Sequence, residues 1–352
     1  MAGSGKDVIM ELDCRAMAGN YNMPQNIHIV MVGCGGNGGH VIPQIMRYNK
    51  SVLNRLSERP RAGQRRQAGS GLQIELTLVD ADVVEQRNLT RQNFIAPDIG
   101  KNKASVLAER YGRAFGLEVG SVEAYLDQEK ANELLARGHG GCLIILGCVD
   151  NNFTRSVLHK AILEASSSGR GYFNIQHVFW IDVANEKFDG QLAIGYRSYA
   201  MINRGYSSLR DRIREVSYWE DMATLAEDLC QGLPSVRRGL HFPMPFITEL
   251  FPTMLQEADD FDPTDPSCAE NAEQVDQAMS TNILSASLMF SAYCQVMTAL
   301  LDRGDARTEE ERRPKANLIH FGHGGRFSTS FNTPNHLAKT LLGNEELELD
   351  AS

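Results

Sequence analysis

The sequence contains no pair of cysteines spaced as C-x-x-C, although seven cysteines occur in its 352 residues. Cysteines in such pairs are common ligands of structural zinc, and densely paired cysteines are typical of small secreted domains. The seven are Cys14, Cys34, Cys142, Cys148, Cys230, Cys268 and Cys294, and several of them lie in apolar or glycine-rich runs. We therefore expect neither a disulfide framework nor structural zinc.

The chain also lacks an excess of positive charge, since its formal net charge is -9. Proteins that bind nucleic acid usually present a basic face to the phosphates, so a nucleic-acid partner is not expected. The hydrophobic fraction of 42% is sufficient for a full core, in one large domain or two modest ones.

No apolar run of signal-peptide length is found in the N-terminal stretch MAGSGKDVIMELD, which predicts a cytoplasmic protein. The uncharged segment 277–301 is long enough to cross a membrane, but it carries serines, threonines, glutamines and an asparagine. We interpret it as a buried helix, with no membrane partner and with a possible place in a homodimer interface.

Strand and helix patterns alternate along the first half of the chain. The strands are expected from residue 26 and at 72–82, 119–124 and 141–150, and the helices at 40–56, 103–115 and 128–137. This order predicts a doubly wound α/β fold: a Rossmann-like mixed sheet with helices on both faces and ligands at the carboxyl ends of the strands. Two runs at 173–185 and 190–199 predict a hairpin added to the sheet edge, and a last strand pair is expected at 317–334.

These patterns divide the chain into five parts. They are an N-terminal extension (1–26), an α/β core (27–199), a helical and acidic insert (200–266), a C-terminal helix and strands that complete the same domain (267–335), and an acidic tail (336–352).

The glycine-rich motif G-x-G-x-x-G follows the first strand and precedes the first helix. There, backbone N–H groups at the helix N-terminus can hold a phosphate. The spacing alone fits a nicotinamide or flavin enzyme equally well. The motif comprises Gly33, Cys34, Gly35, Gly36, Asn37 and Gly38.

A more specific string begins where the second strand ends. Asp80 and Asp82 are followed by the run Asn88-Leu89-Thr90-Arg91-Gln92, then by Gly100 and Lys103. This order resembles the D-x-D…N-L-x-R-Q…G-x-x-K signature of the ThiF/MoeB/ubiquitin-activating family. The resemblance implies that Arg91 and Lys103 contact the triphosphate of ATP and that Asn88 and Gln92 order the site. Independently, a carboxylate at a strand end, here Asp80 or Asp82, commonly accepts hydrogen bonds from a ribose; the alternative is a simple turn aspartate.

The chemistry that this family performs suits such residues. When a carboxylate attacks the α-phosphate of ATP, negative charge builds there and on the departing pyrophosphate. Cations and correct positioning stabilise that charge, and no protein nucleophile is needed. An arginine offers a planar fork and a lysine a point charge.

Further segments agree with the resemblance. The run from Cys148 to Asn152 resembles the family's C-x-D-N segment, which implies that Asp150 binds Mg²⁺ and that Asn151 lies beside the nucleotide; Cys148 is interpreted as strand packing. The stretch 180–192 resembles the family's ID-x-G…GQ hairpin, with Asn185 near the place where a glycine is more usual.

Cys268 precedes the uncharged helix, at a place where several family members carry a cysteine that forms a thioester. The resemblance makes Cys268 the candidate nucleophile. The competing interpretation is an inert loop cysteine, since some members adenylate without a thioester. Arg15 is the candidate for an arginine lent to a neighbouring subunit.

The predicted function is therefore ATP- and Mg²⁺-dependent adenylation of the C-terminal carboxylate of a ubiquitin-like protein that ends in glycine. The segment TELFPTML, followed by PSC and the long helix, resembles the ThiF-like branch of the PRTRC gene system. Three alternatives remain open. They are a small-molecule, peptide or tRNA-linked carboxylate as substrate, a non-catalytic nucleotide-binding partner subunit, and a dehydrogenase.

Overall fold

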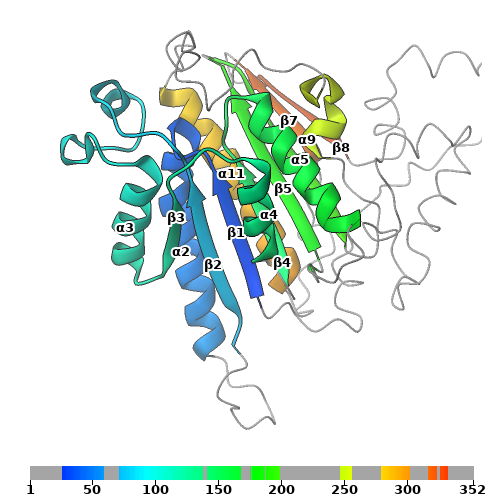
Figure 1. Ribbon diagram of the computed structural model, residues 1–352, viewed down its shortest axis with the longest axis horizontal. Helices are drawn as coiled ribbons and strands as arrows, with labels where there is room; N and C mark the ends of the chain where they lie inside the picture. Colours follow the sequence, from blue (N-terminus) through cyan, green and yellow to red (C-terminus); the bar gives the residue numbers. More distant parts are fainter. Residues whose placement is uncertain are drawn as a thin grey trace, which may run out of the picture.

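The computed structural model describes residues 26–58, 71–137, 141–167, 175, 177–186, 188–198, 246–255, 279–301, 316–322 and 326–331 (Figure 1). The strands are β1 (Asn26–Val32), β2 (Gln73–Val79), β3 (Val119–Val122), β4 (Cys142–Gly147), β5 (His177–Asn185), β6 (Gly190–Ser198), β7 (Ala316–Gly322) and β8 (Arg326–Phe331). The α-helices are α2 (Gly36–Glu58), α3 (Lys103–Phe115), α4 (Gln128–Ala136), α5 (Asn152–Ser167), α9 (Ile247–Leu250) and α11 (Met279–Leu301), and short 3-10 helices are η1 (Gln86–Thr90), η2 (Ala96–Asp98) and η4 (Pro252–Leu255).

The strands form one sheet in the order β3-β2-β1-β4-β5-β6-β7-β8. Neighbours from β3 to β5 are parallel, whereas β6, β7 and β8 continue as antiparallel neighbours. The chain moves outward from β1 to β2 and β3, and then returns to place β4 on the other side of β1. That reversal makes the carboxyl ends of β1 and β4 the point where an open α/β sheet usually binds its ligand.

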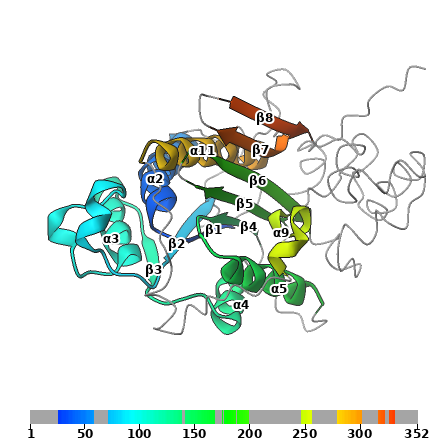
Figure 2. The same ribbon diagram turned by 90° about the horizontal axis from the view of Figure 1, so that it is seen from above.

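Helices cover both faces of the sheet (Figure 2). Alternate residues of β1 face opposite layers: Ile29 and Met31 pack in the core with α2, α3 and α11, and Val30 and Val32 pack in the core with α4, α5 and α9. This alternation follows from the two-residue period of a strand. The predicted doubly wound mixed α/β fold is confirmed.

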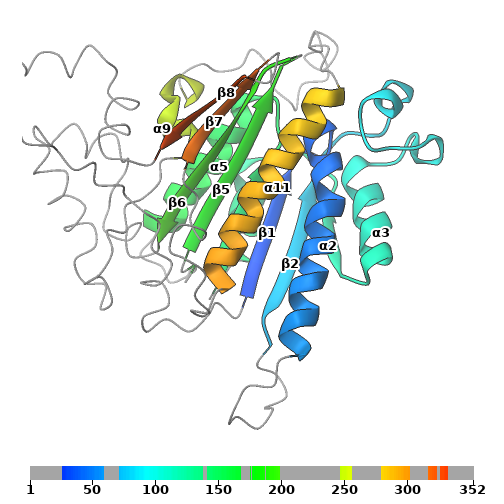
Figure 3. The same ribbon diagram turned by 180° about the vertical axis from the view of Figure 1, so that it is seen from behind.

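The uncharged segment forms the long helix α11, which lies beside α2 and crosses β5 and β6 (Figure 3). Its buried residues include Asn282, Met289 and Tyr293, and the Tyr293 hydroxyl donates a hydrogen bond to Asn49 Oδ1 of α2 at 2.6 Å. The interpretation of this segment as a buried helix is confirmed. Among the described residues, no helix combines the length and the hydropathy that a membrane span requires.

One expectation about the sheet was wrong. The β5–β6 hairpin is not at the sheet edge, because β5 pairs in parallel with β4 and β6 pairs with β7. The last strands extend the sheet beyond the hairpin, so the edges are β3 and β8. Local patterns reveal that two strands form a hairpin but not what lies on either side of it.

Candidate active site

The candidate site lies where β1, β2 and β4 end. The N–H of Gly33 donates to the carbonyl of Val79 at 2.9 Å, and the N–H of Cys148 donates to the carbonyl of Val32 at 2.8 Å. These bonds join the three strand ends just beyond the ladder. The glycine motif, the Asp80 turn and the Cys148–Asp150 segment are therefore brought to one edge of the sheet.

The glycines of the motif allow close backbone approach. Gly33 has a φ of +93°, and a Cβ there would lie 2.5 Å from the Cys148 carbonyl oxygen. A Cβ on Gly38 would overlap the carbonyl oxygen of Gly33, and one on Gly36 would overlap the side-chain amide of Asn282. Backbone atoms therefore require glycine at the first and last positions of the motif, Gly33 and Gly38.

The first turn of α2 begins at this edge and carries no acidic residue. The first N–H groups of a helix have no partner within it, so they and the helix dipole favour an anion. Further along, Pro43 has no N–H for the carbonyl of Gly39, and Asn93 Nδ2 donates to that carbonyl at 3.0 Å instead. The helix is thereby tied to the segment that follows Arg91.

Asp80 supports the glycine turn. Its Oδ2 accepts from the N–H of Cys34 at 2.6 Å, and its Oδ1 accepts from the N–H of Asp82 at 2.8 Å. Burial raises the pKa of Asp80 to about 6, and the nearby Asp82 adds to the rise, while Lys103 and the two hydrogen bonds oppose it. The carboxylate thus fixes the two turns that the predicted nucleotide would contact.

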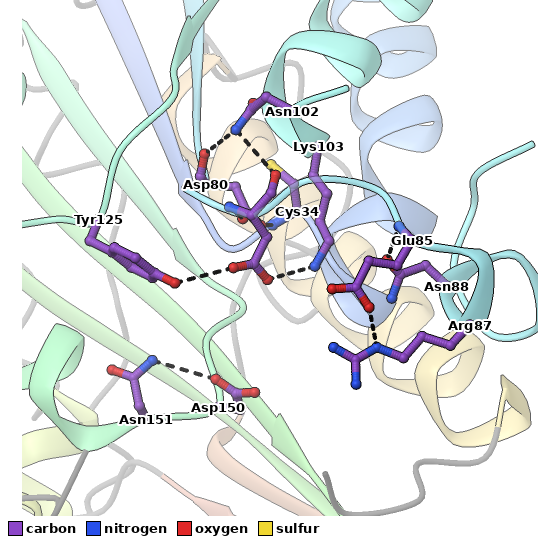
Figure 4. A network of polar contacts seen from close by, with 11 residues as sticks. Cys34, Asp80, Glu85, Arg87, Asn88, Asn102, Lys103, Tyr125, Asp150 and Asn151 are labelled. Atoms are coloured by element: carbon purple, nitrogen blue, oxygen red, sulfur yellow. Dashed lines mark hydrogen bonds and ion pairs between the residues drawn. The ribbon is translucent and has the colours of Figure 1, made fainter. Parts of the chain in front are cut away.

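Lys103 lies in the first turn of α3, where its Nζ donates to Asp82 Oδ2 at 2.6 Å. The Lys103 side chain is only 8% exposed. The hydroxyl of Tyr125 is 3.4 Å from the other oxygen of Asp82, and Asn102 Nδ2 donates to the carbonyls of Asp80 and Asp82. Figure 4 shows Asp80, Asn102, Lys103 and Tyr125 gathered in one polar network.

The predicted loop residues are held around η1. The buried Asn88 accepts from the N–H of Glu85 through its Oδ1 at 2.8 Å, and its carbonyl accepts from the N–H groups of Arg91 and Gln92. The amide of Gln92 lies over Gly35, with its Nε2 3.5 Å from the place of a Cβ there. Asn88 thus orders the turn that presents Arg91 and Gln92 to the glycine motif.

Asp150 enters from the opposite side of the site, after β4, and is exposed (Figure 4). Its Oδ1 is 3.4 Å from the Nδ2 of Asn151, whose own Oδ1 caps α5 by accepting from the N–H of Thr154 at 2.9 Å. Arg155 holds this turn by donating to the carbonyl of Val149 at 2.7 Å. The Asp150 carboxylate therefore has a fixed backbone and an open side chain.

The comparison with protein families matches residues 18–196 to the model described as the ThiF family. That match covers more than half of the chain. The chain belongs to the ThiF family. No curated protein sequence matches the chain significantly.

Three solved structures that are similar to this chain have low sequence identity to it. Escherichia coli MccB is 14% identical, with 88% of this chain and 65% of MccB covered and a TM-score of 0.44. PaaA is 12% identical, with 88% and 74% covered and a TM-score of 0.44. The E. coli tRNA N6-threonylcarbamoyladenosine dehydratase TcdA is 19% identical, with 49% and 60% covered and a TM-score of 0.29. The chain thus spans about two thirds of the length of MccB.

The family assignment bears on the hydride-transfer function that the glycine spacing leaves open. A G-x-G-x-x-G turn is shared with dehydrogenases, but the ThiF-family match extends through the Asp80–Lys103 and Asp150 segments. A hydride-transfer function is therefore no longer favoured.

A metal in this ThiF-family site would need ligands beyond the described residues. The described residues contain no group of three or more histidines, cysteines or carboxylates that could hold a metal ion. Mg²⁺ is commonly bound by one or two carboxylates together with substrate phosphates and water. The exposed Asp150 carboxylate fits that arrangement.

The four described cysteines are poor nucleophiles. Burial raises the pKa of the thiols of Cys34, Cys142 and Cys148 far above the usual range, and it raises the pKa of Cys294 to about 11. The interpretation of Cys148 as strand packing agrees with its contact to Met289. Cys268 and Arg15 lie outside the described residues, and the predicted insert is described only at 246–255.

Several residues that shape the site belong to no functional motif in the sequence. Tyr125 and Asn102 come from separate segments and meet Asp82 only in the fold. Arg155 and Asp182 form a buried ion pair between α5 and β5, with Nε and Oδ1 3.0 Å apart. The asparagines at the start of α3 and before α5 could have been recognised as helix caps, because asparagine is a favoured N-cap.

Proposed function

We propose that this ThiF-family chain is an ATP-dependent adenylyltransferase. A carboxylate oxygen of the substrate attacks the α-phosphorus, the bond from that phosphorus to the bridging oxygen breaks, and pyrophosphate departs with the electron pair. The observation that carries the proposal is the meeting of four elements at one edge of the sheet. They are the N-terminus of α2, the buried Asp80, the Arg91–Lys103 segment and the exposed Asp150.

Each element has a role in that reaction. The N–H groups of Gly35 to Gly38 would bind phosphate oxygens, with Asn37 beside them, and Asp80 and Asp82 would receive the ribose hydroxyls. Arg91 and Lys103 would stabilise charge on the triphosphate. Lys103 Nζ is held by Asp82 at 2.6 Å, so the phosphates would compete with that carboxylate for the ammonium group.

Asp150 would hold Mg²⁺ together with the phosphates, and Asn151 would keep its turn in place. Asn88 and Gln92 act through the geometry of the loop. When bound, Mg²⁺ would neutralise charge on the phosphate oxygens.

The preferred substrate is the C-terminal carboxylate of a ubiquitin-like protein that ends in glycine. The support for this choice is the resemblance of the 80–103 and 148–152 strings to the proteins that activate such modifiers. Because the pKa of each described thiol is raised, Cys268 remains the candidate for a thioester that displaces AMP from the acyl adenylate. A homodimer, with α11 near its interface, completes the proposal.

ATP–pyrophosphate exchange tests the proposal. The assay uses a ubiquitin-like protein ending in glycine, and the same protein with its C-terminal carboxylate blocked as an amide. Exchange is expected with the free carboxylate only. Arg91→Ala, Lys103→Ala and Asp150→Asn should each lower the exchange rate by about 100-fold or more, since each removes charge stabilisation worth about 3 kcal/mol.

Matched controls lie at the opposite end of the domain. Arg113→Ala and Glu118→Gln change an exposed arginine and an exposed carboxylate near the end of α3, and they should leave the exchange rate within twofold. Exchange equal in the Asp150→Asn and Glu118→Gln variants would contradict the role of Asp150. ATP binding without exchange for any protein, peptide, small-molecule or tRNA-linked carboxylate would favour the partner-subunit alternative.

Cys268→Ala separates the two stages. If a thioester forms, this variant keeps the exchange reaction but loses a thiol-sensitive adduct seen with the wild-type chain. Exchange without an adduct in either protein would identify an adenylating enzyme with an inert Cys268.

A further inference from the structure

Three side-chain amides from separate parts of the chain form a continuous series of hydrogen bonds. Asn37 Nδ2 of α2 donates to Asn185 Oδ1 at the end of β5, at 2.6 Å. Asn185 Nδ2 donates to Asn282 Oδ1 of α11 at 3.0 Å, and Asn282 Nδ2 donates to the carbonyl oxygen of Arg91 at 3.3 Å. We call Asn37, Asn185 and Asn282 the amide relay. It joins the first turn of α2 to the Arg91 main chain by way of α11.

Asn282 is completely buried in a helix that is otherwise rich in apolar residues. A buried amide is unfavourable unless its donors and its acceptor are satisfied, so an asparagine here requires the two partners that it has. Its neighbour in α2 is Gly36, where a Cβ would overlap the Asn282 amide. The missing Cβ at Gly36 therefore makes room for the relay.

The relay has a direction, because each amide group donates to the next and the series ends at the Arg91 carbonyl. At its other end, Asn37 Oδ1 is buried and has no hydrogen-bond partner among the described residues. A series of aligned hydrogen bonds polarises its members, so the first and last groups are coupled more strongly than isolated pairs would be. The open acceptor lies in the glycine motif, next to the proposed nucleotide.

We propose that Asn282 is a positioning residue, which holds the main chain of Arg91 against the first turn of α2 through the amide relay and makes α11 part of the nucleotide site. This inference rests on the proposed function for the role of Arg91, but the relay itself is independent of the substrate. The relay also gives a role to Asn185, the last residue of β5. A residue without a side-chain amide at 185 could not connect Asn37 to Asn282.

Hydrogen exchange and pyrophosphate exchange together test the proposal. In Asn282→Ala, amide hydrogens in residues 86–94, which include the Arg91 and Gln92 donors to Asn88, should exchange at least tenfold faster. The rate of ATP–pyrophosphate exchange at saturating ATP should fall at least tenfold. Ser285→Ala is the matched control: Ser285 is equally buried in the same helix, but its hydroxyl donates to Thr281 within α11. It should change neither quantity by more than twofold.

Asn185→Ala breaks the relay without altering α11, and it serves as the test if Asn282→Ala does not fold. The double variant Asn185→Ala/Asn282→Ala should be no worse than the worse single variant, because a series that acts as a unit is lost at its first break. Effects that multiply would overturn the proposal. Unchanged hydrogen exchange at 86–94 would overturn it too, as would faster hydrogen exchange with a normal pyrophosphate exchange rate. If the wild-type chain activates no carboxylate, the proposed function fails, and hydrogen exchange alone still decides whether the relay holds Arg91.

Discussion

Gly33 and Gly100 share a left-handed backbone but differ in their surroundings. Their φ angles are +93° and +82°, and a Cβ would meet the Cys148 carbonyl at Gly33 but nothing within 4 Å at Gly100. We expect Gly100→Ala to lower the free energy of unfolding by about 1 kcal/mol through backbone strain alone. Gly33→Ala should cost about 2–4 kcal/mol, because overpacking adds to the strain. Urea unfolding measures both, and equal losses would contradict the close approach at Gly33.

Asp80 should give the stability of the protein a pH dependence of its own. Because its pKa is raised from 3.8 to about 6 in the folded chain, the folded state holds its proton more tightly than the unfolded state does. The resulting stabilisation is complete below pH 3.8 and is lost as the pH rises to about 6, with an amplitude of about 2 kcal/mol after screening is allowed for. The Asp80→Asn variant has no titrating group at this position, so this contribution to the pH dependence is absent.

The measurement is the free energy of urea unfolding from pH 3.5 to 7 for the wild-type chain and for Asp80→Asn. The variant should gain stability relative to the wild-type chain as the pH rises through this window. If the stability of the two proteins changed with pH in parallel, the pKa of Asp80 would not be raised in the folded chain.

Sequence reasoning singled out the charged residues of the candidate site but not their pairing. The strings around Asp80, Arg91 and Lys103 indicated one region, and the structure brings Asp80 and Lys103 together through Asp82. The ion pair between Asp82 and Lys103 spans 21 positions and depends on how the 83–101 loop closes, which no local spacing encodes. Asn185 and Asn282 are further from any motif, since their role exists only where three segments meet.

Among the elements, the turn after β4 depends on the ion pair between α5 and β5. The side chains of Arg155 and Asp182 are 4% and 1% exposed, and Arg155 also donates to the carbonyls of Val149 and Asn151. Arg155→Met would leave a buried carboxylate without its cation and should lower the free energy of unfolding by about 3–5 kcal/mol. Arg113→Met removes an exposed helix pair with Glu109 and should change it by at most about 0.5 kcal/mol. Similar losses in thermal or urea unfolding would show that the buried pair contributes little.

Element boundaries were predictable where the local signals agree. Helix α3 begins after the Asn102 cap and ends at Gly116 in the left-handed conformation, and the predicted range of 103–115 is confirmed. Helix α2 was expected from residue 40 but begins at Gly36. Glycines are poor helix formers, so here the packing of the first turn against the strand ends and α11 overrides local propensity.

At the scale of the whole molecule, the order of the strands was the part that the sequence left open. Alternating strands and helices indicate a parallel doubly wound sheet, but they do not place β5 between β4 and β6 or extend the sheet to β8. Those neighbours are fixed by contacts between distant segments, such as the pairing of β6 with β7 across more than a hundred residues.

The raised pKa values of the four described thiols give a prediction for the intact protein. Iodoacetamide at pH 7.5 should leave Cys34, Cys142, Cys148 and Cys294 unmodified in the folded chain and modify all four in urea, because only thiolates react and these thiols remain protonated. Peptide mapping by mass spectrometry separates them from the remaining cysteines. Rapid modification of Cys34 in the folded chain would contradict its burial beside Asp80.

Pro43 shows how a conventional stabilising change could impair this protein. A designer would replace a proline inside a helix to recover the missing backbone hydrogen bond. In this helix, however, the restored N–H would compete with Asn93 for the carbonyl of Gly39. The gain in helical regularity would then weaken the link to the loop that carries Arg91, so greater thermal tolerance would come with slower turnover. The imperfection in α2 is thus better understood as an attachment point than as a defect.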